Sequence, residues 1–165
     1  MPAPPPMRFV SREERSQLNN AKDAKSRIQT TIDLAAEHLA NAETYTAQRQ
    51  FNLAAEELGR YWGLLDDVEQ FLFSLNSNKN KVRDLYRHAE FNIHKLVPRL
   101  AVMRRDTPTE YAGHIKDAED FTRDLRSKIL DSFYGAPTFR LGSPGAGEEK
   151  KADTVKGLNE TVKRP

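Results

Sequence analysis

Histidine and acidic side chains at helical spacing are the groups in this sequence best suited to hold a metal ion. Three of the four histidines follow an acid by four positions, which places both groups on one helical face: Asp84–His88, Glu90–His94 and Glu110–His114. The remaining histidine is His38. Di-iron bundles use carboxylates and imidazoles on helices, but through a Glu-x-x-His pattern that does not occur here. We therefore expect surface pairs, and predict no metal and no cofactor.

Catalytic patterns are also missing from the sequence. It has no Gly-rich phosphate loop, no nucleophile elbow and no H-E-x-x-H motif. The lack of cysteine excludes a thiolate zinc site, a cysteine nucleophile and a disulfide framework. Neighbouring acids such as Asp66 and Asp67 point to different sides of a helix, so they do not form a catalytic pair. We predict that the protein is not an enzyme.

Basic residues are concentrated in one stretch. Residues 79–105 carry eight bases and two acids, whereas residues 50–75 carry one base and five acids. One interpretation is that the two stretches are neighbouring helices that pair through opposite charge. The other is that the basic stretch is an exposed face that binds an anion, a lipid or an acidic protein. The first is favoured because a short turn joins the two stretches.

A proline inside the basic stretch marks a second candidate feature. Pro98 has no N–H for the carbonyl of His94 and its ring clashes there, so the helix should kink, or end and restart, near 94–98. The next helix runs back past this point and could bring His114 close to His94. A pocket there would be lined by His94, Arg99, His114 and Trp62. The predicted ligand or partner surface is His94, Arg99, His114, Arg83 and Arg87.

Four long helical segments must position these side chains. Apolar residues recur at intervals of three and four from Ser11 to about residue 47, and again over about 50–75, 80–105 and 107–135. Joined by short turns, these segments predict an all-α, antiparallel up-down-up-down four-helix bundle. The predicted domain is 11–135, with a Pro-rich extended arm at 1–10 and a Gly/Pro/charged tail at 136–165; arm and tail are expected to be disordered.

Two glycines stand inside the most apolar segment. Gly59 and Gly63 flank Trp62, and each costs roughly 1 kcal/mol relative to alanine in a helix interior. Close approach of a neighbouring helix or of a bulky aromatic ring would explain them. Trp62 lies one step off the apolar seam, so we expect it to cover the edge of the core rather than to form a site.

Composition and charge narrow the possible partners. The net charge is +2, but residues 1–10 and 136–165 carry the excess of bases. Residues 11–135 are nearly neutral, with 19 bases against 20 acids, which disfavours nucleic-acid binding. No stretch is apolar enough to span a membrane. A soluble protein is expected, cytoplasmic, or periplasmic or secreted if a signal peptide has been removed.

The predicted function is a non-catalytic interaction or structural module with an unidentified protein partner. The alternative is a small-ligand or anion-binding bundle that uses the basic third helix and its bend at Pro98. The oligomeric state does not follow from the sequence.

Overall fold

All regular secondary structure is helical in the computed structural model, which describes residues 1–76 and 78–134. The helices are α1 (Arg12–Asn19), α2 (Ala24–Ala47), α3 (Phe51–Phe73), α4 (Asn80–His94), α5 (Leu96–Arg105) and α6 (Thr109–Tyr134). No strand occurs in these ranges, so the all-α class is confirmed. The predicted tail, 136–165, lies outside the described residues.

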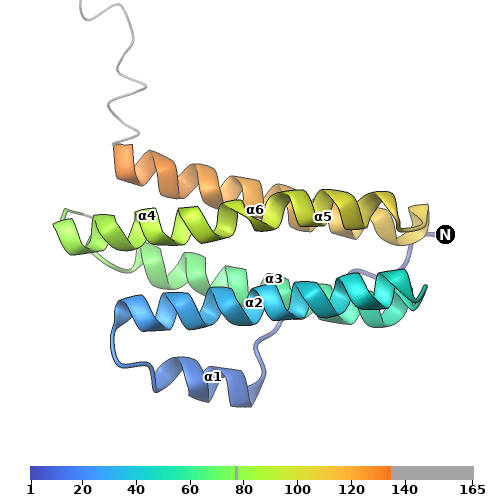
Figure 1. Cartoon of the computed structure of the whole chain (residues 1–165), viewed down its shortest axis with the longest axis horizontal. Helices are drawn as coiled ribbons and strands as arrows, with labels where there is room; N and C mark the ends of the chain where they lie inside the picture. The colour runs from blue at the N-terminus through green and yellow to red at the C-terminus, as the bar shows by residue number, and fades with distance from the viewer. Residues whose placement is uncertain (77, 135–165) are drawn as a thin grey trace, which may run out of the picture. The chain divides into compact units, whose positions relative to one another are not determined.

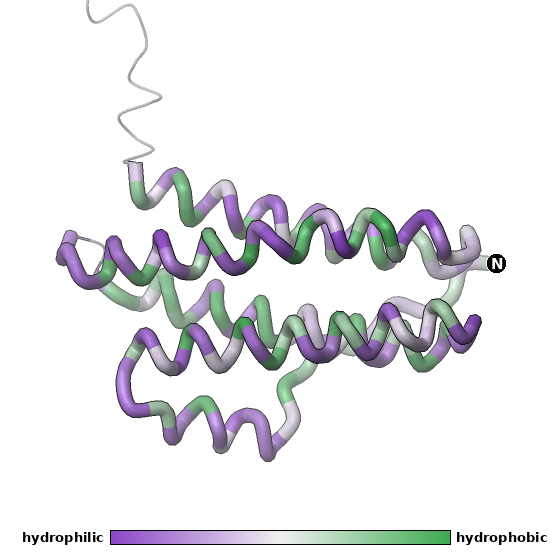
Figure 2. The backbone as a smooth tube through the Cα atoms, viewed as in Figure 1, coloured by the Kyte–Doolittle hydropathy of each residue, from purple (hydrophilic) through white to green (hydrophobic). Residues whose placement is uncertain are grey.

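The long helices bury their apolar stripes against one another. α2 packs along α3, and Figure 1 shows α4 and α5 in line with each other beside α6. Hydrophobic positions recur along each helix in Figure 2, as the three- and four-residue spacing predicts. Buried hydroxyl groups in this core have partners: Tyr61 bonds Thr122 at 2.8 Å, and Tyr86 donates to the Leu72 carbonyl at 3.1 Å.

The first helical segment is interrupted, which corrects the prediction of one helix from Ser11 to about residue 47. The capping box at Ser11 forms as its pattern predicts, with Glu14 N donating to Ser11 Oγ at 3.1 Å. α1 nevertheless ends at Asn19. α2 then starts afresh because Asp23 Oδ1 accepts a hydrogen bond from Ser26 N at 2.8 Å and caps it. A side-chain cap is therefore enough to break the segment without glycine or proline.

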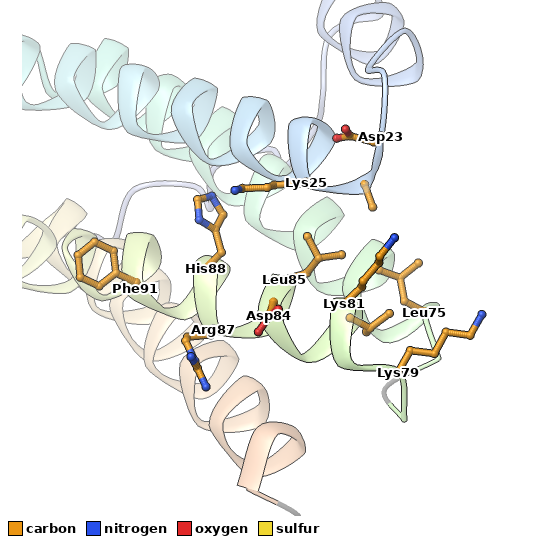
Figure 3. A pocket seen from close by; sticks show the side chains of 12 residues that line it. Asp23, Lys25, Leu75, Lys79, Lys81, Asp84, Leu85, Arg87, His88 and Phe91 are labelled. Carbon is orange, nitrogen blue, oxygen red and sulfur yellow. The ribbon is translucent and has the colours of Figure 1, made fainter.

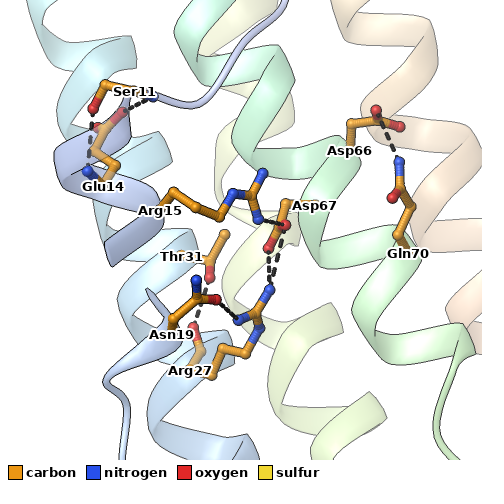
Figure 4. Close-up of polar contacts among 9 residues, drawn as sticks. All are labelled: Ser11, Glu14, Arg15, Asn19, Arg27, Thr31, Asp66, Asp67 and Gln70. Carbon is orange, nitrogen blue, oxygen red and sulfur yellow. Dashed lines mark hydrogen bonds and ion pairs between the residues drawn. The ribbon is translucent and has the colours of Figure 1, made fainter. Parts of the chain in front are cut away.

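A buried carboxylate holds α1 against the longer helices. Asp67 of α3, only 9% exposed, accepts hydrogen bonds from Arg15 of α1 and from Arg27 of α2, the latter at 3.1 Å (Figure 4). The adjacent Asp66 turns away and accepts a hydrogen bond from Gln70 on its own helix, at 3.3 Å. The two acids have separate environments, as their adjacency on a helix requires.

The third predicted segment is divided at Lys95, which confirms the expected interruption near Pro98. α4 ends at His94 and α5 begins at Leu96. Lys95 keeps helical backbone angles (φ −69°, ψ −19°), so the two helices continue in nearly one line. The interruption follows because Pro98 has no N–H to offer the His94 carbonyl.

The N-terminal arm is ordered against the helices, so the prediction of a disordered arm is wrong. Ala3 N donates to the Glu110 carbonyl at 2.9 Å, and His114 Nε2 donates to the Ala3 carbonyl at 2.6 Å. Further along, the Arg8 guanidinium lies 4.0 Å from the centre of the Trp62 ring. These contacts fix residues 1–10 because each joins the arm to a long helix.

The arm also explains the paired glycines. A Cβ at Gly59 would lie 2.1 Å from the Met7 carbonyl oxygen, and one at Gly63 would lie 2.5 Å from that of Phe9. The partner is thus the backbone of the arm, not a neighbouring helix or an aromatic ring as predicted. Both glycines exist at these positions because any side chain would push the arm off α3.

Trp62 lies between the arm and the core. It is 6% exposed, and its ring is 5.9 Å from that of Phe121 on α6. Its indole Nε1 is buried and makes no hydrogen bond within the part of the chain that the structure describes. The expectation that Trp62 covers the edge of the core is confirmed. The Arg8 guanidinium stacks over the face of the ring as a cation–π contact.

Candidate functional site

The structure places His94, Arg99 and His114 in separate environments. Arg99 of α5 forms a two-pronged ion pair with Glu43 of α2, at 2.6 and 3.2 Å. His114 of α6 is engaged by the N-terminal arm through the Ala3 carbonyl. His94 is exposed at the end of α4. Two of these three side chains are therefore occupied by contacts within the chain.

Arg83 and Arg87, in contrast, are brought together. Both guanidinium groups lie over the ring of Phe133 on α6, at 5.2 and 4.9 Å from its centre. Arg83 also donates to the Phe133 carbonyl at 3.0 Å. Of the five predicted surface residues, only Arg87 also lines the groove between α2 and α4 that is described below.

The acids of α3 do not pair with the basic stretch, which corrects the favoured interpretation of the charge pattern. Asp67 binds arginines of α1 and α2, and Glu69 binds Lys128 of α6 at 2.9 Å. Arg99 and Arg104, from the basic stretch, pair instead with Glu43 of α2 and Glu119 of α6. Within residues 1–76 and 78–134, no ion pair joins an α3 acid to a base of 79–105.

An open groove of about 890 Å³ lies between the start of α2 and α4. We call it the α2–α4 groove. Figure 3 shows Lys25 of α2 facing His88 of α4, with Leu85 next along the groove and Leu75 farther along it near Lys81. Its apolar residues are Ala24, Leu75, Val82, Leu85 and Phe91, and its charged residues are Asp23, Lys25, Lys79, Lys81, Asp84 and Arg87. The ring of Phe91 is 61% exposed, so the groove offers a large aromatic surface to solvent.

Bases outnumber acids in the α2–α4 groove by four to two. Among the residues that the structure describes, Lys25, Lys79, Lys81 and Arg87 take part in no ion pair, although Arg27 of α2 does. Lys95 adds a further positive charge beside the groove, with its Nζ 4.4 Å from the centre of the Phe91 ring. The groove thus combines exposed apolar surface with positive charge that the chain leaves unpaired.

His88 is kept neutral at the wall of this groove. Burial lowers the pKa of His88, and the nearby charge of Lys25 lowers it further. Its Nε2 donates to Gln29 Oε1 on α2, which joins the two helices that form the groove. At neutral pH the positive charge of the groove therefore comes from lysine and arginine, and it does not depend on histidine protonation.

The chain matches no protein-family model, no curated protein and no solved structure. Function must accordingly be inferred from the chemistry of the described surface.

No group of three or more histidine, aspartate or glutamate side chains within the described ranges is placed to hold a metal ion. None of the helices that the structure describes is long and apolar enough to cross a membrane.

Sequence reasoning missed the α2–α4 groove, although one signal was present. Phe91 is an aromatic residue outside the predicted apolar seam of its helix, and such a residue is exposed unless another element covers it. Nothing in the sequence indicated that Lys25 belongs to this groove, because the tertiary fold alone brings it close to α4.

A second cluster that the sequence did not indicate joins α1, α2 and α3. The imidazole of His38 lies between two carboxylates, with Nε2 2.6 Å from Glu14 and Nδ1 2.5 Å from Glu57. Burial by itself lowers the pKa of His38, but the hydrogen bonds and charges of Glu57 and Glu14 outweigh it and leave the pKa above 6.5. Burial raises the pKa of Glu14, but bonds from His38 and Ser11 leave it below 4.5. A protonated His38 therefore ties three helices together.

This cluster predicts a defined pH dependence of stability. The His38 contribution is fully present below about pH 6.5, its unfolded pKa, and is lost as pH rises through the higher folded pKa. The Glu14 contribution is present above about pH 4.5 and is lost as pH falls through its lower folded pKa. The free-energy difference between wild type and His38→Gln, measured by urea unfolding, should be largest at about pH 4.5–6.5 and shrink toward pH 8–9.

A substitution that removes no titratable group provides the control. Gln17→Ala should change stability by the same small amount at every pH, because Gln17 is an exposed, uncharged side chain of α1. A His38→Gln difference that stays constant from pH 5 to 9 would contradict the assigned role of His38.

Proposed function

We propose that this protein is a non-catalytic helical-bundle interaction module that binds a protein partner in the α2–α4 groove. This proposal includes an antiparallel up-down-up-down bundle of four helical segments: α2, α3, the α4–α5 pair and α6. α1 and the arm pack on it as additional segments. The observation that carries the proposal is the groove itself, with exposed apolar residues and unpaired bases.

The shape of the groove favours a macromolecular partner. Sites for small molecules enclose most of their ligand's surface, whereas this groove lies open between two helices. Phe91 exposes 61% of its area there, and exposed aromatic residues are typical anchors of protein interfaces. The anion-binding alternative is weaker at Pro98, because the neighbouring Arg99 is already neutralised by Glu43.

Site-specific cross-linking tests the proposal. The photoreactive residue p-benzoyl-phenylalanine at position 91 should give a discrete adduct with one protein in the cells that express this chain, mapped by mass spectrometry to one segment of that protein. The matched control is the same residue at position 102, because Val102 is 47% exposed, apolar and outside the groove. No adduct at position 91, or the same adducts at both positions, would exclude the groove as the binding site.

A further inference from the structure

We infer that the partner segment that binds in the α2–α4 groove is an acidic amphipathic helix. This inference rests on the proposed function and specifies the chemistry of its partner. It follows from three properties of the groove: its excess of bases, the uncapped amino end of α4, and the spacing of the apolar residues along its base, which we call its floor.

Unpaired positive charge selects an acidic partner. Lys25 projects from α2, while Lys79 and Lys81 lie at the start of α4, so bases come from both walls of the groove (Figure 3). None of these three lysines forms an ion pair within residues 1–76 and 78–134, although Asp23 lies near enough to Lys25 to feel its charge. Carboxylates on a partner would find these ammonium groups on either side of the apolar floor, which gives both orientation and faster association.

The amino end of α4 adds to the positive potential of the groove. α4 begins at the groove and has no acidic residue in its first turn, whereas the start of α2 is already capped by the carboxylate of Asp23. α4 also lacks a side-chain cap at Lys79, so its first amide groups have no partner of that kind. The amino end of a helix carries a partial positive charge and unbonded N–H groups, and both favour carboxylates.

The floor selects a helix rather than an extended segment. Leu85, His88 and Phe91 are spaced by three residues along α4, with Leu75 and Val82 continuing the apolar surface. An amphipathic helix with apolar residues at i, i+3, i+4 and i+7 fits a groove between two helices. A segment bound as an added β-strand would need an unpaired strand edge, and both walls of this groove are helices.

Charge argues against two other occupants. The chain's own residues 136–165 carry six bases and four acids, so their net charge has the same sign as the groove. Nucleic acid is recognised by extended basic surfaces, whereas this groove has two acids and an apolar floor.

Selection from a displayed library of random 18-residue peptides tests the inference on the full chain. Enriched peptides should be acidic, carry apolar residues at helical spacing and become helical on binding. Lys81→Glu and Phe91→Ala should each weaken binding about tenfold or more, as for central interface residues. Exposed positions outside the groove supply the matched controls, Arg105→Glu and Val102→Ala, which should leave affinity unchanged.

Charge reversal gives the sharpest result. A selected peptide whose glutamates are replaced by lysine should lose affinity for wild type and recover part of it with a Lys25→Glu, Lys81→Glu double variant. Enrichment of basic or Pro-rich peptides, or no enrichment, would overturn the inference. It would also be overturned if inorganic phosphate, duplex DNA or phosphatidylserine vesicles bound with the same dependence on Lys81 and Phe91.

The two proposals fail in different ways. A mapped adduct at position 91 together with selected peptides that are not acidic helices would refute the partner chemistry and leave the groove as an interface. Absence of the adduct would refute the proposed function itself.

Discussion

Replacing Gly59 with alanine should lower the free energy of unfolding of the full-length protein by about 1–3 kcal/mol. The new Cβ would lie 2.1 Å from the Met7 carbonyl oxygen, and backbone at that distance must move. The arm would lift from α3, and the hydrogen bonds of Ala3 and the Arg8–Trp62 contact would weaken with it. Denaturant unfolding monitored by tryptophan fluorescence measures the loss, since Trp62 is the only tryptophan.

The same substitution should raise the free energy of unfolding when the arm is absent. In a chain that begins at Ser11, Gly59→Ala should stabilise by up to about 1 kcal/mol, because alanine is the better helix former. Gly113→Ala should stabilise full-length protein by a similar amount, since a Cβ there meets nothing within 4 Å. If Gly59→Ala and Gly113→Ala stabilised the full-length chain equally, the arm would not occupy its described place.

Asp67→Ala should cost about 3 kcal/mol, the range for removing one partner from a buried ion pair. Asp67 is 9% exposed and is shared by Arg15 of α1 and Arg27 of α2. Its loss would leave the Arg27 guanidinium, whose Nε is already buried without a partner, uncompensated. The value lies at the lower end of that range because Arg15 is 45% exposed and can recover hydration.

The neighbouring acid is the matched control for this prediction. Asp66→Ala removes the same group one position away but breaks only a bond to Gln70, so it should change stability by about 0.5 kcal/mol or less. Chemical denaturation of both variants measures the loss of global stability. Hydrogen exchange of the backbone amides of Arg12–Asn19 shows separately whether α1 is released from the other helices. Equal effects of the two substitutions would show that Asp67 does not hold α1.

Local chemistry predicted much of this fold. The apolar spacing gave the core positions of α3 and α4, the Ser11 capping box marked the start of α1, and Pro98 marked the interruption between α4 and α5. Each of these depends on residues within a few positions of one another. The break between α1 and α2 was equally local, through Asp23, but the uninterrupted apolar stripe concealed it.

Contacts between distant residues were not predictable in the same way. Gly59 and Gly63 indicated a close neighbour but could not identify it, because residues 1–10 carry no helical pattern that would place them on α3. The His38 cluster and the approach of Lys25 to α4 across the groove both depend on how separate helices pack. Of the five residues predicted for a ligand or partner surface, only Arg87 lines the α2–α4 groove, because helix packing brings the other lining residues together.

The position of the arm also sets an order of events during synthesis. Ala3 precedes its partner His114 by 111 positions, so it leaves the ribosome well before that partner is made. The glycine surface on α3 is made earlier, but the arm cannot complete its contacts until α6 has emerged and packed. Residues 1–10 are therefore the last part of the described fold to be secured, and until then the face of Trp62 that Arg8 covers remains exposed to solvent.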